Sequence, residues 1–200
     1  MGNNVSSSNL NSPLLSPLAN PLMDSLRDLA AWLEAEKIPY AIIGGVAVAI
    51  VAQPRMTKDI DVTISLDPGR LESFLETASA YNLGPRISDA ADFARRQQVV
   101  LLLHQPTGIN VDLTLAAMEF DYELIERART GPMNLKVATS EDLIITKAVA
   151  HRPRDVADIE AILNIEPNLD VERIRHWVGQ FAQSLEMPEL LEDLEKLLRP

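Results

Sequence analysis

The stretch that most restricts the possible folds is IIGGVAVAIVAQPRMTKDIDVTI, which covers residues 42–64. It begins with an uncharged apolar run that contains two adjacent glycines, and it ends with an alternating sequence that carries two aspartates. Such a run is too short to cross a bilayer, so we expect it to be buried in a globular core. Gly44 and Gly45 separate a strand-like segment from small aliphatic residues that are typical of a packed helix, which Pro54 ends. The pattern predicts a strand, a tight turn, a helix and a second strand over residues 59–64.

The other hydrophobic patterns alternate between helical and strand-like spacing. Helical spacing is present at residues 21–37, 68–81 and 118–129, and strand-like runs are present at residues 40–43, 97–104, 109–115 and 133–139. A turn-forming Gln-Pro-Thr-Gly sequence joins two of these runs and predicts a hairpin. Beyond Thr139, which stands three residues before Asp142 as in a helix-starting sequence, only helical patterns follow.

These patterns predict an α+β fold, in which a small mixed β-sheet is flanked by helices and is followed by a C-terminal helical region. We expect the sheet domain to occupy residues 21–138 and the helical region to occupy residues 139–200. Residues 1–20 are rich in Asn, Ser and Pro and carry no charged side chain, so we expect a disordered tail. They lack the basic start and the continuous apolar stretch of a signal peptide.

The charge balance limits the partners of the chain. There are 29 acidic and 18 basic residues, which give a formal net charge of −11. Such an excess of negative charge argues against extended binding to DNA or long RNA. The absence of cysteine excludes thiol chemistry and disulfides and fits a cytoplasmic protein, and the three histidines lack the spacing of a zinc site.

The two aspartates of the quoted stretch are the first candidate for chemistry. Residues two apart in a strand point to the same face, so Asp59 and Asp61 are expected to lie side by side. Two neighbouring carboxylates repel each other unless a cation lies between them, and hard oxygen ligands suit Mg²⁺. Taken alone, an Asp-x-Asp sequence is more simply explained by a charged strand end or turn, so the motif needs further support.

Two further features extend this candidate site. Glycines between a strand and a helix let backbone N–H groups approach phosphate oxygens, although Gly44 and Gly45 also fit a simple tight turn. Asp112 is the only charged residue in GINVDLTLAA, and a carboxylate in an apolar strand needs a partner or a metal. If this strand lies beside residues 59–64, three carboxylates converge, as two-metal phosphoryl transfer requires. The alternative is that Asp112 faces solvent on an edge strand.

The ordered set of Gly44-Gly45, Asp59, Asp61 and Asp112 resembles the nucleotidyltransferase superfamily of DNA polymerase β. In that fold a glycine-containing turn precedes an Asp-x-Asp strand, and a third aspartate follows on a later strand. The intervening sequence QPRMTKDIDV is most similar to the AbiEii and MenT type of bacterial nucleotidyltransferase toxins. The resemblance covers about residues 38–163. Many members have serine at the position of Gly45, where this chain offers only a backbone donor.

The resemblance also implies roles for residues after the sheet domain, where these proteins carry a lysine and then a cluster of basic and acidic residues. Lys147 matches the lysine, and the alternative for this position is an exposed surface lysine. Arg154 and Asp158, four residues apart, also fit a solvated helix pair. Arg55 and Lys58 flank the aspartates and could neutralise phosphate charge or pair with them. The implied nucleotide-binding residues are Gly44, Gly45, Lys58, Arg152, Arg154, Asp155 and Asp158.

The resemblance therefore implies an Mg²⁺-dependent enzyme that transfers a nucleoside monophosphate from an NTP to a hydroxyl. Its metal ligands would be Asp59, Asp61 and Asp112, and Lys147 would assist catalysis. The acceptor could be a tRNA 3′ end or a protein side chain, and a toxin role would imply an antitoxin partner or phage defence. Two alternatives stay open, namely a non-catalytic nucleotide-binding module of the same fold and a small-molecule transferase of the antibiotic-modifying type.

Overall fold

The structure is a computed structural model that describes residues 20–53 and 56–199. Its strands are β1 (Tyr40–Ile43), β2 (Asp59–Ile64), β3 (Leu83–Pro85), β4 (Val99–His104), β5 (Ile109–Leu115), β6 (Arg129–Thr130) and β7 (Lys136–Val137). Its α-helices are α1 (Asn20–Ala35), α2 (Gly44–Val51), α3 (Leu71–Thr77), α4 (Ala90–Gln97), α5 (Glu119–Arg127), α6 (Ser140–Ala150), α7 (Pro153–Ile165), α8 (Val171–Ser184) and α9 (Glu189–Leu197).

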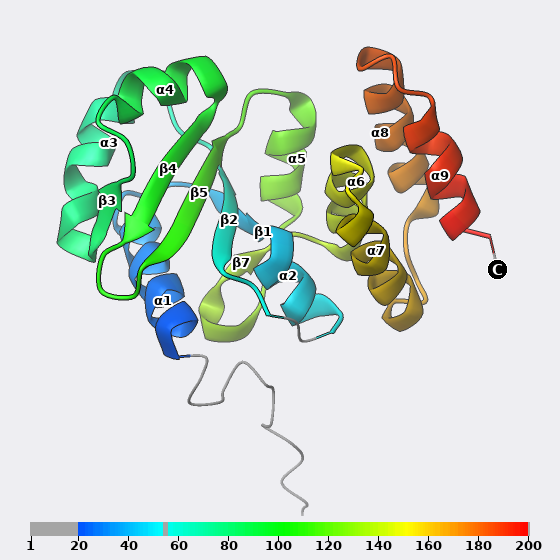
Figure 1. Ribbon diagram of the computed structural model, residues 1–200, viewed down its shortest axis with the longest axis horizontal. Helices are drawn as coiled ribbons and strands as arrows, with labels where there is room; N and C mark the ends of the chain where they lie inside the picture. Colours follow the sequence, from blue (N-terminus) through cyan, green and yellow to red (C-terminus); the bar gives the residue numbers. More distant parts are fainter. Residues whose placement is uncertain (1–19, 54–55, 200) are drawn as a thin grey trace, which may run out of the picture.

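The strands of this described part form one mixed sheet with the order β3-β4-β5-β2-β1-β7-β6. Strand β2 is antiparallel to β1 and parallel to β5, and β5 is antiparallel to β4. In the view of Figure 1, α3 and α4 lie on the left beside β3 and β4, and α6 to α9 lie together on the right, beyond α2 and α5. The predicted α+β class is confirmed.

Burial alternates along β4 and β5, as expected for strands with one packed face. Val100, Leu102, Val111 and Leu113 are fully buried in the core. The residues between them on β4 and β5 are half-exposed. This part of the sheet therefore has one closed face, which supplies stability, and one partly open face on which polar side chains can be reached by a ligand.

Most of the expected elements are present. The strand over residues 59–64 and the hairpin between 97–104 and 109–115 are confirmed as β2 and as β4–β5. The segment over residues 68–81 is an α-helix with a 3₁₀ turn at each end, Pro68–Arg70 and Ala78–Tyr81, rather than one continuous helix.

One predicted strand is shorter than expected, and three elements were not predicted. Within residues 133–139 only Lys136 and Val137 are in a strand, because Met133 and Asn134 have positive φ values of 58° and 60° in a 3₁₀ turn. Helix α4 and the short edge strands β3 and β6 were missed. Helix α4 has only two buried residues, Ala90 and Ala94, so its sequence lacks a wide apolar stripe.

The C-terminal helices are joined to the rest of the molecule by a buried ion network. Asp142 on α6 is completely buried and accepts hydrogen bonds from Thr139 Oγ1 (2.8 Å) and from Arg173 Nε (3.1 Å). Arg173 on α8 also donates to Glu123 on α5. This network fixes α6, and with it the side chains that α6 directs toward α2, relative to the sheet.

The predicted N-terminal tail, up to residue 19, and Arg55 lie outside the described residues. Within the residues that the structure does describe, no helix combines the length and the apolar character needed to span a membrane.

Candidate active site

The glycine turn lies against one of the predicted aspartates. Strand β1 ends at Ile43, whose register partner on β2 is Asp61, and α2 begins at the next residue, Gly44. Gly44 has a φ of +63°, and a Cβ added to it would lie 2.7 Å from Asp61 Cγ. Only glycine permits both this backbone conformation and this close approach. The turn is therefore built around the Asp61 carboxylate.

The predicted convergence of the aspartates follows from strand pairing. In the parallel pair β2–β5, Asp61 is the register partner of Asp112, and Asp59 is the partner of Asn110. Asn110 Nδ2 donates a hydrogen bond to Asp59 Oδ1 at 3.2 Å. Paired residues on neighbouring strands point to the same face, so the three carboxylates share the open face of the sheet. Strand β5 lies between β4 and β2, so the edge-strand alternative for Asp112 is wrong.

The pKa values of two of these carboxyl groups are raised. The pKa of Asp61 is raised chiefly by burial and then by the charge of Asp59, while Lys147 and Arg152 act in the opposite direction. Burial also raises the pKa of Asp112, against the effect of the neighbouring Arg86. Both shifts mean that burial disfavours the ionised forms and that the nearby cations do not fully offset this effect.

A cavity of about 460 Å³ opens beside the glycine turn, which is within the size range of small-ligand sites. Residues from β1, the start of α2, the segment before β2, and helices α6 and α7 line it. Its lining residues are Ile43, Gly44, Gly45, Met56, Thr57, Lys58, Asp59, Asp61, Thr146, Lys147, Ala150, Arg152 and Arg154. The structure thus brings together eight of the predicted site residues around one hollow.

The other three predicted site residues lie just outside this lining. Asp112 is one strand further along the sheet than Asp61, on the same face. Asp155 and Asp158 lie behind Lys147, whose Nζ is 3.0 Å from Asp155 Oδ1 and 2.8 Å from Asp158 Oδ2. Lys147 is only 5% exposed, so the alternative of a surface lysine is wrong.

Asp155 holds two cations at the edge of the cavity. It accepts hydrogen bonds from Lys147 Nζ, from Arg152 Nε (2.6 Å) and from the Arg152 backbone N–H (3.2 Å). Burial alone would raise the pKa of Asp155, but the hydrogen bonds from Arg152 and Lys147 outweigh burial and lower it. The stability that this carboxylate contributes is therefore present at neutral pH and is lost as the pH falls through its lowered pKa.

We expect Lys147→Met to lower the free energy of unfolding by about 3–5 kcal/mol, because it removes the ammonium group between two buried carboxylates. The measurement is urea denaturation at pH 7. Lys136→Met is the control, since Lys136 is exposed and its Nζ contacts only Thr130 Oγ1 among the described residues. Equal losses for the two variants would contradict the role of Lys147 as the centre of a buried ion cluster.

One charged residue beside the site was missed. Arg86, which follows β3, directs Nη2 onto Asp112 Oδ1, and its side chain is 25% exposed. The sequence around it, LGPRISD, contains no motif, and β3 itself was not predicted. Only the antiparallel pairing of β3 with β4 brings Arg86 to the site, so no local signal could have found it.

The three carboxylates fit a divalent cation by their chemistry. Within residues 20–53 and 56–199, no three acidic or histidine side chains stand close enough together to form a ready set of metal ligands. Asp59, Asp61 and Asp112 nevertheless present hard oxygen atoms on one face, and the raised pKa values of Asp61 and Asp112 show that positive charge would be favourable there.

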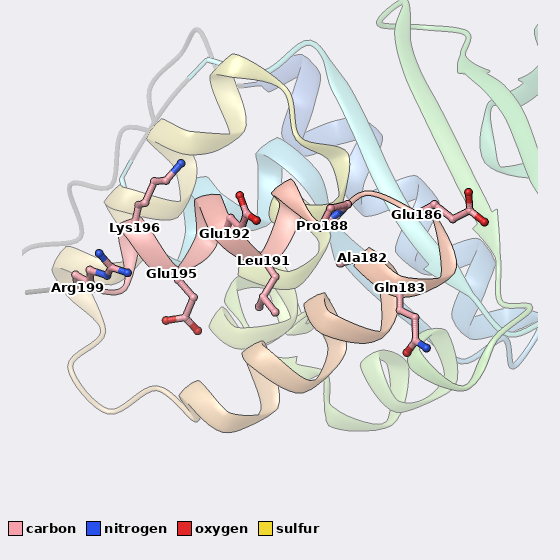
Figure 2. A pocket seen from close by; sticks show the side chains of 9 residues that line it. All are labelled: Ala182, Gln183, Glu186, Pro188, Leu191, Glu192, Glu195, Lys196 and Arg199. Atoms are coloured by element: carbon pink, nitrogen blue, oxygen red, sulfur yellow. The ribbon is translucent and has the colours of Figure 1, made fainter.

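Two other features of the described residues could suggest a site. A larger hollow of about 920 Å³ lies along α8 and α9, where Leu191 and charged side chains such as Glu192 and Lys196 line it (Figure 2). Its Glu195 is paired with Arg175 at 2.7 Å. The hollow contains neither a glycine turn nor any of the predicted site residues, so its size does not make it the active site.

A buried Ser–His–Asp group connects α1 with the β4–β5 hairpin. His104 Nδ1 is 3.0 Å from Ser25 Oγ, and His104 Nε2 is 3.0 Å from Asp28 Oδ2. Ser25 is completely buried and its hydroxyl donates to the Pro21 carbonyl, so it cannot reach a substrate. This group holds α1 against the hairpin and is not a nucleophilic centre.

Comparisons with known proteins agree with the geometry. ANT(2")-Ia in complex with adenylyl-2"-tobramycin is similar over 82% of this chain and 99% of its own, with 15% identity and a TM-score of 0.54. An antigenic nucleotidyltransferase-like protein from Paracoccidioides brasiliensis is similar over 89% of this chain and 94% of its own, with 16% identity and a TM-score of 0.50. At these identities the likeness concerns the fold alone.

JHP933 from Helicobacter pylori is also similar in fold, over 94% of this chain and 78% of its own, with 12% identity and a TM-score of 0.50. No curated protein gives a significant sequence match. A family model described as a nucleotidyltransferase of unknown function (DUF6036) matches residues 22–189. Because this match covers most of the chain, the chain belongs to that family of nucleotidyltransferases.

Proposed function

We propose that this chain transfers a nucleoside monophosphate from an NTP to a hydroxyl group in an Mg²⁺-dependent reaction. The observation that carries the proposal is the pairing of Asp61 with Asp112 on parallel strands beside the glycine turn at the start of α2. A helix start that suits phosphate binding and a set of carboxylates therefore lie next to each other. Nucleotidyl transfer needs both at once.

The triphosphate is bound in the cavity beside the turn. Gly44 and Gly45 are the first two residues of α2. The free backbone N–H groups at the start of a helix bind phosphate oxygens favourably. Lys58, Arg152 and Arg154 line the same cavity and supply positive charge to a ligand that carries several negative charges. Asp155 orients Arg152 and contacts Lys147, and Asp158 contacts Lys147 as well. The two carboxylates therefore fix the positions of these cations without lining the cavity themselves.

The reaction is a displacement at the α-phosphorus. The acceptor oxygen forms a bond to this atom, the bond from the α-phosphorus to the β-phosphate oxygen breaks, and pyrophosphate leaves with the electron pair. Asp59 and Asp61 would hold Mg²⁺, and Asp112 either takes the proton of the hydroxyl or would complete a second metal position. A metal held by these carboxylates would supply polarisation of the phosphate and neutralisation of the charge that develops in the transition state. Lys147 lines the cavity and adds positive charge close to the leaving group.

Two classes of acceptor follow from different observations. A tRNA 3′ end or a protein side chain follows from the similarity of QPRMTKDIDV to the AbiEii and MenT type, which also implies a toxin with an antitoxin partner. A small hydroxylated molecule is supported by the fold of ANT(2")-Ia, whose complex contains adenylyl-2"-tobramycin. The net charge of −11 favours an acceptor that needs only a local contact over a long RNA.

The acceptor class is tested by incubating the chain with each α-labelled NTP, Mg²⁺, and either total RNA, total protein or a set of aminoglycosides. We expect label in one class of acceptor with the wild type and none with Asp59→Ala. Asp24→Ala is the matched control, because Asp24 is exposed on α1 and pairs with Arg27. Nucleotide binding without transfer to any acceptor would replace this proposal with a non-catalytic binding module of the same fold.

A further inference from the structure

Arg86 is held beside the carboxylates by both its backbone and its side chain. Its backbone N–H donates to the carbonyl of Leu101 at 2.9 Å, and Leu101 is the register partner of Asp112 on β4. Its guanidinium contacts Asp112 Oδ1 through Nη2. The Nε–H group of Arg86 is buried and has no hydrogen-bond partner. The attraction to Asp112 therefore offsets an unmade hydrogen bond at Nε.

The three carboxylates consequently differ in how they are neutralised. Among the contacts within the described part of the chain, Asp61 has no hydrogen bond or ion pair, and Asp59 accepts one amide hydrogen bond from Asn110. Of the three, Asp112 is the one that contacts a cationic group among the described residues. Its Oδ1 is occupied by Arg86, whereas the oxygens of Asp61 are open to an ion.

A divalent cation at Asp112 would stand close to the positive charge of the guanidinium. Like charges at this separation repel strongly in a half-buried site, so Arg86 and the ion compete for the same carboxylate. A bound triphosphate brings several negative charges into the adjacent cavity and compensates for the extra cation. The two positions for an ion, at Asp59–Asp61 and at Asp112, are thus unequal before the nucleotide arrives.

We propose that Arg86 is an internal counter-ion that keeps a divalent cation away from Asp112 until a nucleotide is bound. The inference rests on the proposed function, because it concerns the same carboxylates. Arg86 is then a positioning residue, and its charge prevents a second divalent cation from binding at Asp112 in the nucleotide-free site. The acceptor hydroxyl is then deprotonated only when the triphosphate is in place.

The test is a titration of the chain with Mn²⁺, in which the free ion is measured by electron paramagnetic resonance. For the nucleotide-free wild type we expect one ion per chain, and for the wild type with a non-hydrolysable α,β-methylene NTP we expect a second ion. For Arg86→Gln without nucleotide we expect the second ion to bind at least about tenfold more tightly than in the wild type, since the repelling charge is gone.

Two further variants separate charge from structure. Arg86→Lys keeps the positive charge and should behave like the wild type, whereas a purely structural role of the guanidinium would make Lys and Gln equivalent. Arg96→Gln removes an exposed arginine of α4 that pairs with Asp89, and it should leave the Mn²⁺ titration unchanged. Circular dichroism shows whether each variant is folded.

Two bound ions of similar affinity on the nucleotide-free wild type would overturn the inference, and this result does not depend on any variant. An Arg86→Gln titration identical to that of the wild type would overturn it as well. The failure of the proposed function looks different, because no Mn²⁺ would then bind at the site even in the presence of the nucleotide analogue.

Discussion

Asp61→Asn is expected to slow nucleotidyl transfer by about 10³-fold or more, because it removes the carboxylate that lies between the glycine turn and Asp112. The same change is expected to raise the free energy of unfolding at pH 7. Asp61 has a raised pKa, so its ionised form destabilises the folded chain. The wild type should lose stability as the pH rises from the unfolded-state pKa of Asp61 through its raised folded-state pKa, and the variant should not.

Transfer rates and urea denaturation at several pH values check this prediction together. Asp92→Asn is the matched control, because Asp92 is exposed on α4 and pairs with Arg95. This control should change neither the rate nor the pH dependence. If Asp61→Asn is inactive and also has a lower free energy of unfolding than the wild type at pH 7, Asp61 is a structural residue and the prediction is wrong.

Gly44→Ala is expected to reduce both stability and transfer, since the new Cβ meets two constraints at once. The positive φ costs about 1–2 kcal/mol in any residue with a Cβ. The methyl group would also lie 2.7 Å from Asp61 Cγ and 2.8 Å from its Cβ, so the carboxylate must move. A displacement of about 1 Å at a reacting group lowers the rate of transfer by about 10²-fold.

Gly108→Ala separates these two effects. Gly108, in the β4–β5 turn, also has a positive φ of +72°, but a Cβ there meets no atom within 4 Å. It should therefore show only the backbone cost, with normal transfer. Urea denaturation and initial rates of both variants provide the comparison. Equal losses of stability in the two variants, with transfer unaffected in Gly44→Ala, would show that the contact with Asp61 has no functional consequence.

Local sequence patterns were sufficient for the centre of the fold. The apolar run with two glycines forms the end of β1 and helix α2, as its pattern predicts. The alternating Asp59–Ile64 segment and the apolar segment around Asp112 form strands β2 and β5. The convergence of Asp61 with Asp112 depended on one further assumption, namely that their strands are neighbours. That pairing is confirmed.

The remaining features depend on contacts that are distant in the sequence. Arg86 reaches the site only through the pairing of β3 with β4, and β3 is too short to give a pattern. The burial of Lys147 follows from the packing of α6 against α7, which brings Asp155 and Asp158 around its ammonium group. Helix α4 was missed because its contact with the sheet uses alanines rather than a broad apolar face.

The central claim is that the α-phosphoryl group of an NTP, with its nucleoside, is transferred to a hydroxyl. Its most direct test is to supply the chain with the same NTP labelled either at the α- or at the γ-phosphate, in the presence of Mg²⁺ and the identified acceptor. We predict that α-label appears in the acceptor and that γ-label appears only in pyrophosphate. Label from the γ-phosphate in the acceptor, or γ-label released as inorganic phosphate alone, would contradict the account.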